Sequence, residues 1–352
     1  MLSKKNYSAE HILEQIKRYP SVDPAKMEMT IFAFGLLEEL IRAGVPLIFK
    51  GGTSLMLLFD NPKRVSTDID IIVPPDVSFD ALFERVKKRF PFYEGEERGQ
   101  RGGSHFRHFY FMFYGPISGK ECRVNLDVAF EKNPYPHTLE KELTLPFLLS
   151  SGASSWVSLP SASSVLGDKL TAFAPNTVGV NPSMTSLGKP IDNRLQVMKQ
   201  FYDIARLSEV VDSLDEVLLS YRACLRFENE FRGTSFGEKE CLLDAFASAA
   251  SVASMGEWDK ASSFYAEVAR PGIQGLATNV FDGKYNQLSA AVDAAKVMNL
   301  IAALLCGCEL KTDGASIPNK DKRMRAFKSI PDPEAFSLIR QAIQALTEKG
   351  LL

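Results

Sequence analysis

Apolar residues recur at helical spacing near the start of the chain and again in its second half, and they alternate with polar residues in between. Over residues 26–44 they return every three or four positions, which predicts a helix that ends near Gly44. Residues 105–114 and 121–130 are rich in aromatic and β-branched side chains, which predicts two strands. The pattern indicates an α+β fold with a helical N-terminal segment, an α/β core and a mainly helical C-terminal domain. The predicted bounds of these parts are 1–44, 45–160 and 161–352.

Shorter elements are predicted between the first helix and the two strands. Residues 45–51 form a short apolar run that predicts a strand, and Thr53 or Ser54 is suited to cap a short helix after it. Residues 67–73, "TDIDIIV", alternate as a strand does. Two polar, glycine-rich stretches predict loops, the second of them long enough for a lid: 94–104 and 175–190.

Composition narrows the class of protein only slightly. The chain has 352 residues, of which 45% are hydrophobic and 24% charged, and its net charge is -2. Such values are typical of a globular protein and exclude wholesale disorder. The five cysteines are scattered, the N-terminus lacks the apolar run of a signal peptide, and the run "VMNLIAALLCGC" is about half the length of a membrane helix. We therefore expect a cytoplasmic protein without a membrane partner.

Asp68 and Asp70 are the first candidate site residues. In a strand, residues two positions apart point to the same face, so the two carboxylates repel each other. A divalent ion, Mg²⁺ or Mn²⁺, would offset this repulsion, because it takes one or two carboxylates and fills its other positions with water and substrate phosphates. The alternative is an exposed strand edge with two solvated aspartates.

Gly51 and Gly52 precede the predicted helix that contains Thr53 and Ser54. Backbone N–H groups at a helix N-terminus bind anions, and the missing Cβ atoms let a phosphate approach closely. The alternative is a turn that merely requires positive φ. No G-K-[ST] follows, so this is not a P-loop.

Three further residues fit the same site. Asp127 lies in the apolar run "VNLDVAF", and if its strand pairs beside residues 67–73, three carboxylates can hold metal, with Asp127 also a candidate base. Capping of a neighbouring turn is an equally good explanation for Asp127. Arg64 and Ser66 stand beside the acids and can contact phosphate; a phosphate group on Ser66 would place negative charge against the site.

These motifs, G-G-T-S-L, R-x-S-x-D-x-D-I and an isolated aspartate in an apolar strand, resemble those of the polymerase-β nucleotidyltransferase superfamily. More narrowly, the chain resembles the AbiEii/AbiGii toxins, to which the mycobacterial MenT toxins belong. The resemblance implies a polymerase-β-like core with a mixed sheet, and an enzyme that moves a nucleotidyl group from a nucleoside triphosphate (NTP) to an acceptor. It further implies a toxin of phage defence whose acceptor is the 3′ end of tRNA and whose partner is a cognate antitoxin.

The resemblance also assigns roles to Lys169 and Asp203, which stand at the family's positions in "GDKLTAF" and "RLQVMKQFYDIARL". A lysine can neutralise a triphosphate oxygen as a compact charge, and the aspartate can orient it or contact the nucleotide. Lys199 lies four residues before Asp203, so an intrahelical ion pair is the competing explanation.

The acceptor would need a surface of its own. A basic run near the C-terminus contains Phe327, and such a cluster can grip a nucleic-acid backbone and stack a base, although a solvated helix face is the commoner meaning. Its candidate residues are Lys320, Lys322, Arg323, Arg325 and Lys328. Alternatives to tRNA are a small molecule or a protein as acceptor, or a nucleotide-binding protein without turnover.

Overall fold

The structure, a computed structural model, describes all residues except 99–104, 187–188 and 309–321. It divides into two compact units, and each is described by itself. The first contains residues 1–161 together with Thr278–Gly283, and the second contains the remainder of the chain.

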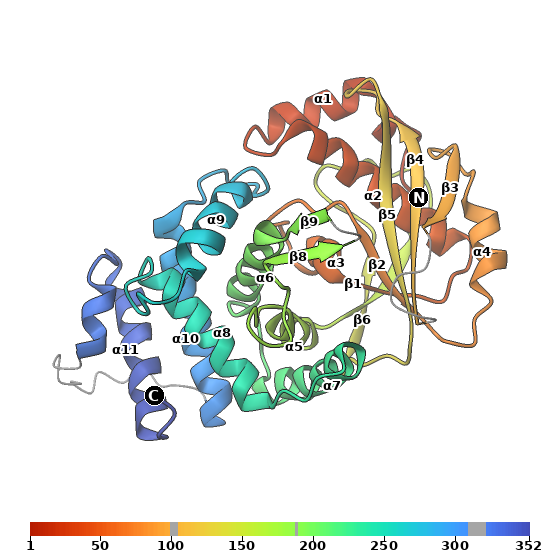
Figure 1. The fold of residues 1–352 in the computed structure, drawn as a ribbon. Coiled ribbons are helices and arrows are strands. Elements are labelled where there is room, and N and C mark those ends of the chain that lie inside the picture. Colours follow the sequence, from red (N-terminus) through yellow and green to blue (C-terminus); the bar gives the residue numbers. More distant parts are fainter. Residues whose placement is uncertain (99–104, 187–188, 309–321) are drawn as a thin grey trace. The chain divides into compact units, whose positions relative to one another are not determined.

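The first unit is built on a mixed sheet of seven strands in the order β3-β4-β5-β2-β1-β7-β6. The pairs β5–β2 and β2–β1 are parallel and antiparallel, respectively, so the strands at its centre do not share one direction. The expected mixed α+β fold is therefore confirmed (Figure 1). The strands are β1 (Ile48–Lys50), β2 (Ile69–Val73), β3 (Glu94–Arg98), β4 (Phe106–Tyr114), β5 (Glu121–Phe130), β6 (Thr138–Glu142) and β7 (Trp156–Pro160).

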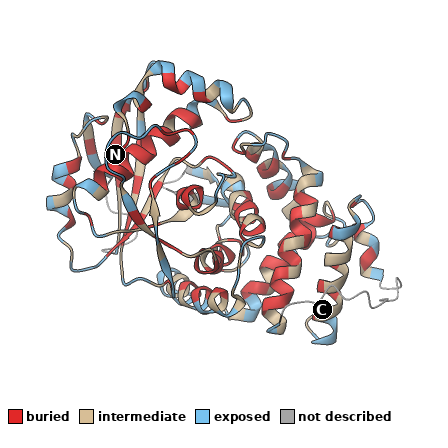
Figure 2. Cartoon of the chain, turned by 180° about the vertical axis from the view of Figure 1, so that it is seen from behind, coloured by how far each residue is buried: buried red, intermediate tan, exposed pale blue. Residues whose placement is uncertain are grey.

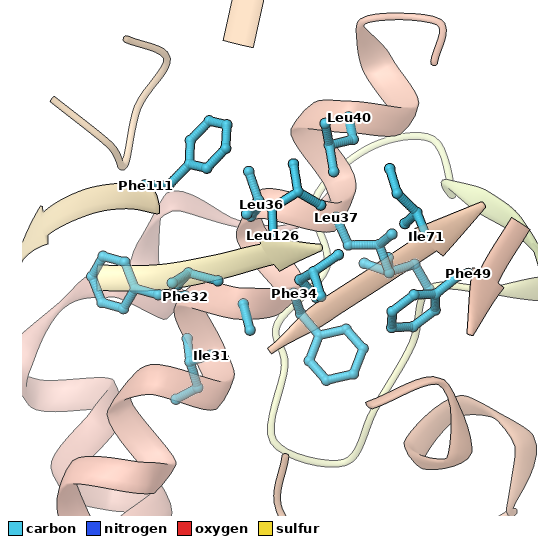
Figure 3. Packing of buried hydrophobic residues seen from close by; sticks show 14 of the residues in the cluster. Ile31, Phe32, Phe34, Leu36, Leu37, Leu40, Phe49, Ile71, Phe111 and Leu126 are labelled. Atoms are coloured by element: carbon cyan, nitrogen blue, oxygen red, sulfur yellow. The ribbon is translucent and has the colours of Figure 1, made fainter. Parts of the chain in front are cut away.

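Helices pack against one face of this sheet and form the core with it. α2 (Pro24–Arg42) and α4 (Phe79–Val86) bury their apolar sides against the alternate residues of β4 and β5 that point towards them. Phe32 of α2 stacks on Phe113 with ring centroids 3.8 Å apart, and Figure 3 shows further core residues from α2 and the central strands together. The other helices of this unit are η1 (Lys4–Tyr7), α1 (Ala9–Arg18) and α3 (Gly51–Leu58).

The observed start and end of α2 (Pro24–Arg42) have clear chemical causes. The side chain of Asp23 accepts hydrogen bonds from the backbone N–H groups of Ala25 and Lys26, and Pro24 occupies the first helical position. Gly44 follows the helix with φ +79°, a conformation that other residues adopt at a cost. The helix predicted over 26–44 is therefore confirmed.

The second unit is mainly helical. Its elements are α5 (Ala162–Ala172), the hairpin β8 (Ser183–Ser186) and β9 (Lys189–Asp192), α6 (Arg194–Leu207), α7 (Leu214–Arg232), α8 (Glu238–Ala253), η3 (Tyr265–Ala269), α9 (Arg270–Leu276), α10 (Gln287–Cys306), η4 (Lys322–Phe327) and α11 (Pro333–Glu348). Buried residues run along the packed sides of these helices (Figure 2).

The apolar run near residue 300 is part of α10, a longer helix than the sequence suggested. α10 has 20 residues and is long and apolar enough to cross a membrane, but 67% of an apolar stretch of 18 residues in it is buried within the protein. Burial to this extent is typical of a core helix.

Two predicted loops contain strands. Residues 94–98 form the edge strand β3, which pairs with β4, whereas 99–104 lie outside the described residues. The stretch 175–190 includes most of the hairpin β8–β9. In both places a strand of low intrinsic propensity is stabilised by its partner, which local composition does not reveal.

Candidate active site

Two neighbouring strands bring the three acidic residues to one face. β2 pairs in parallel with β5, and the register sets Asp70 opposite Asp127. Asp68 precedes β2 by one residue and stands two positions from Asp70. Ile69 and Ile71 are fully buried on the other face, so the three aspartates share the face opposite the core. The strand pairing on which the third acid depended is present.

Hydrogen bonds hold two of these carboxylates in place. Asn125 Nδ2 donates to Asp68 Oδ1 at 2.8 Å, and His108 Nδ1 lies 2.7 Å from Asp127 Oδ1. An ionised carboxylate only accepts, so Nδ1 is the protonated ring nitrogen of this pair. Sequence analysis missed both partners, because each meets its aspartate only through cross-strand register. His108 stands opposite Asp127 in the antiparallel β4–β5 pair, whereas Asn125 and Asp68 directly precede the paired residues Leu126 and Ile69 of the parallel β5–β2 pair. The turn at 115–120 sets the register of β4 against β5, and it is the sequence signal that would have placed His108 beside Asp127.

The three aspartates fit a divalent cation that is shared with a substrate. Carboxylate oxygens are the hard ligands that Mg²⁺ and Mn²⁺ prefer. Throughout the described ranges, no three His, Cys, Asp or Glu residues are arranged to hold a metal ion by themselves. Mg²⁺ commonly takes only one or two protein carboxylates and completes its shell with water and phosphate oxygens. Asp68, Asp70 and Asp127 would hold such an ion once substrate phosphates are present.

The two glycines lie against the acidic and basic side chains of the site. Gly51 begins α3 with φ +74°, and a Cβ there would lie 2.8 Å from Asp70 Cγ, closer than real Cβ contacts. A Cβ on Gly52 would lie 2.6 Å from Arg64 Nη2 and 3.3 Å from Ser66 Oγ. The turn therefore needs glycine both for its backbone conformation and for the close approach of its neighbours.

Thr53 and Ser54 act differently from the sequence-based prediction. α3 begins at Gly51 rather than after these residues, and its N-cap is Lys50, so the predicted cap is wrong. Thr53 Oγ1 donates to the carbonyl of Asp68 at 2.5 Å, and Ser54 Oγ donates to the carbonyl of Gly51 at 2.9 Å. Their hydroxyl groups thus fix the turn and the acidic strand, and the backbone N–H groups of the first helical turn remain the donors for an anion.

A distant segment holds the loop that carries Arg64 and Ser66. The N–H of Val65 donates to the carbonyl of Asn279 at 2.7 Å, and Asn279 lies in the segment 278–283, which is part of the first unit. Arg64 is only 5% exposed and donates from Nη1 to the carbonyl of Val65 at 3.1 Å. Thr30 Oγ1 donates to the carbonyl of Ser66 at 3.1 Å. The loop beside the glycines is therefore fixed on several sides.

Lys169 and Asp203 form a buried ion pair in the second unit. Lys169 Nζ of α5 lies 3.1 Å from Asp203 Oδ2 of α6, and the two side chains are only 6% and 3% exposed. The same Nζ donates to Gln200 Oε1 at 2.8 Å. The two residues are therefore neighbours, and the role of Asp203 in orienting Lys169 stays a prediction.

The C-terminal basic run is only partly available to a nucleic acid. Lys320 lies outside the described residues, and Lys322, Arg325 and Lys328 are exposed. Phe327 is fully buried, with its ring centroid 5.5 Å from that of Trp258. Stacking of a base on Phe327 is therefore wrong, because this ring serves the core of the second unit.

Comparison with known proteins identifies the family. The model of the AbiEii nucleotidyl transferase toxin family, of type IV toxin–antitoxin systems, matches residues 36–282. This match covers more than half of the chain, and the protein belongs to that family. It is thus a nucleotidyltransferase and a toxin of a type IV system, which implies an antitoxin as partner. The resemblance expected from the sequence motifs is confirmed.

Solved structures show distant likenesses. JHP933 from Helicobacter pylori is 11% identical with a TM-score of 0.45, and the alignment covers 78% of this chain and 93% of that one. MenT4, a nucleotidyltransferase toxin from Mycobacterium tuberculosis, is 13% identical with a TM-score of 0.42, and the alignment covers 97% of both chains. Similarity at this level carries no argument about mechanism. No curated protein matches the sequence.

Proposed function

We propose that this toxin transfers a nucleotidyl group from an NTP to the 3′ hydroxyl of a tRNA, with Mg²⁺ or Mn²⁺. The observation that carries the proposal is the register of β2 and β5, which sets Asp70 beside Asp127 next to the glycine turn at Gly51. Acids for a metal and backbone donors for phosphates thus stand on adjoining elements of one unit. We also expect the enzyme to act in the cytoplasm and in defence against phage.

Several residues of the site are suited to bind the phosphates of the NTP. The N–H groups at Gly51 and Gly52, together with Arg64 and Ser66, receive the phosphates that leave. Lys169 in the second unit is assigned, through the family resemblance, to neutralising phosphate charge. When bound, the divalent ion supplies positive charge that stabilises the charge developing on the reacting phosphate.

The acceptor oxygen forms a bond to the α-phosphorus while the bond from that phosphorus to the bridging oxygen breaks, and pyrophosphate leaves. Asp127 completes the metal site or accepts the proton of the hydroxyl group, and His108 keeps its carboxylate oriented. The nucleoside has room on the same face: a cavity of about 630 Å³, lined in part by Ile48, Ile72 and Pro74, lies further along β2 from Asp70.

Incubation with each α-labelled NTP, Mg²⁺ and total tRNA tests the proposal. Label should appear on tRNA with the wild-type protein and disappear with Asp70→Asn, which keeps the side-chain size and removes the charge. Omission of Mg²⁺ should have the same effect. Label on tRNA that persists in Asp70→Asn would overturn the assigned metal site. Absence of label on tRNA, together with transfer to a small molecule or protein, would overturn the assigned acceptor.

A further inference from the structure

Tyr110 lies between two arginines on the face of the sheet that carries the aspartates. The rings of Phe109 and Phe111, its neighbours along β4, are fully buried on the opposite face, so Tyr110 faces outward as His108 does. The guanidinium carbon of Arg123 (β5) lies over the Tyr110 ring, 4.1 Å from its centroid, and that of Arg98 (β3) lies 5.5 Å away. Three adjacent strands thus build one platform, defined by Arg98, Tyr110 and Arg123 (Figure 1).

The guanidinium groups of this platform are available for a ligand. Arg98 and Arg123 are exposed, and within the described part of the chain neither has an ion pair or a hydrogen bond from its guanidinium. Arg107 of the same sheet differs, because Glu97 and Asp80 both accept from its Nη2 at 2.7 Å. Each of the two guanidinium groups can donate hydrogen bonds to an anion, whereas Glu96 stands opposite Tyr110 on β3 and the aspartates of the site lie beyond Asn125.

Sheet topology places the platform on the acceptor side of the site. The glycine turn follows β1, on one side of the acidic residues of β2, whereas β5, β4 and β3 follow on the other side. In-line transfer requires the attacking oxygen and the leaving pyrophosphate to stand on opposite sides of the phosphorus. An acceptor must therefore approach from β5 when the leaving phosphates are held at the glycines. Tyr110 stands opposite Asn125, whose side chain bonds Asp68, so the platform adjoins the acids directly.

We propose that the platform of Arg98, Tyr110 and Arg123 binds the single-stranded end of the acceptor nucleic acid. A base stacks on the outer face of the Arg123 guanidinium, which the Tyr110 ring supports from its other side, and the N–H groups of both arginines contact backbone phosphates. Arginine suits this double task because its planar group stacks and donates at once. The inference rests on the proposed transfer to a nucleic-acid end and adds the surface that holds it.

Fluorescence anisotropy of a labelled single-stranded oligoribonucleotide, without NTP, tests the platform. Tyr110→Ala should weaken binding about tenfold or more, whereas Tyr110→Phe keeps the stacking ring and should bind within about twofold of wild type. Arg123→Gln should weaken binding and lower the salt slope by about 0.7. Arg85→Gln, which removes an exposed charge from α4 on the opposite face, is the matched control and should bind like wild type.

Several results would overturn the inference. The first is undetectable binding of the oligoribonucleotide by the wild-type protein. The second is equal oligoribonucleotide affinity of Tyr110→Ala and Arg85→Gln. The third is a Tyr110→Ala variant that loses only NTP binding, which would make the platform a nucleotide site. Two results distinguish failure of the platform from failure of the proposed nucleotidyl transfer. If Tyr110-dependent binding occurs but no acceptor is labelled, the transfer proposal falls and the platform stands. If tRNA is labelled at an undiminished rate by Tyr110→Ala, the platform falls and the transfer proposal stands.

Discussion

Replacing Gly51 by alanine tests whether the glycine turn and the acidic strand work as one unit. The new side chain must adopt φ near +74°, which destabilises an L-residue by about 1–2 kcal/mol. Its Cβ would also lie 2.8 Å from Asp70 Cγ, so the carboxylate has to move away from its place on β2. A misplacement of about 1 Å at a reacting centre lowers the rate on the order of 100-fold. We expect Gly51→Ala to lose nucleotidyl transfer to that extent.

Gly44→Ala is the matched control, because it separates backbone strain from contact with Asp70. Gly44 has φ +79°, and nothing lies within 4 Å of the position its Cβ would take. Both variants should therefore melt about 2–8 °C below wild type. Only Gly51→Ala should lose activity, measured as label transferred per folded protein well below the melting transition, and only it should lose Mg²⁺-dependent NTP binding in calorimetry.

The reasoning is refuted if Gly51→Ala retains the activity of Gly44→Ala at the same fraction folded. Such a result would mean that Asp70 can leave its position without harm, and that the glycine serves the backbone turn alone. Equal loss of activity in both variants would instead assign the effect to stability.

Three further predictions concern the buried ion pair, the loop beside the glycines and a surface pair. Asp203→Ala leaves the buried Lys169 without this carboxylate and should lower the free energy of unfolding in urea by about 3–5 kcal/mol. Ser66→Glu should abolish labelling while Ser66→Ala keeps it, because negative charge beside the glycine turn repels the triphosphate. Arg194 lowers the pKa of Asp192 to about 2, so the stabilisation from this pair is complete above about pH 3.9 and is lost as the pH falls through about 2.

Each of these has an outcome that would count against it. A loss under about 1 kcal/mol in Asp203→Ala would show that the ammonium finds other solvation, contrary to the cost of a broken buried pair. Labelling by Ser66→Glu at the rate of Ser66→Ala would remove that residue from the phosphate site. An Asp192 carboxyl that titrates near its ordinary pKa of about 3.9 by NMR would show that its bond to Arg194 does not persist in solution.

Elements with strong periodicity were predictable from the sequence, whereas those stabilised by a partner were not. The aromatic and β-branched content of 105–114 predicted the strand β4, and the acids at positions two apart predicted the shared face of β2. β3, with the sequence EGEER, has little strand propensity and exists because β4 pairs with it. The bonds from His108 and Asn125 to the aspartates depend on cross-strand register, which local patterns do not contain.

The start of α3 and the burial of Phe327 also could not be predicted from the local sequence. A hydroxyl residue next to a glycine predicts a helix N-cap. The hydroxyl group of Thr53 instead donates its hydrogen bond to the carbonyl of Asp68, fifteen positions away in sequence. The lysines and arginines around Phe327 suggest that its ring is exposed. The ring instead packs against Trp258 in the core of the second unit. In each case a contact between distant residues decides between two locally acceptable arrangements.

The loop that holds Arg64 is fixed by a segment that the ribosome makes much later. Residues 278–283 supply the carbonyl that receives Val65 N–H and the N–H that donates to Lys63 at 3.2 Å. A nascent chain that has emerged only to residue 277 contains Asp68, Asp70 and Asp127 but lacks the segment that fixes this loop. Until residues 278–283 have been made, the loop that carries Arg64 lacks both of these backbone hydrogen bonds, so we expect it to be held less firmly in the nascent chain than in the folded protein.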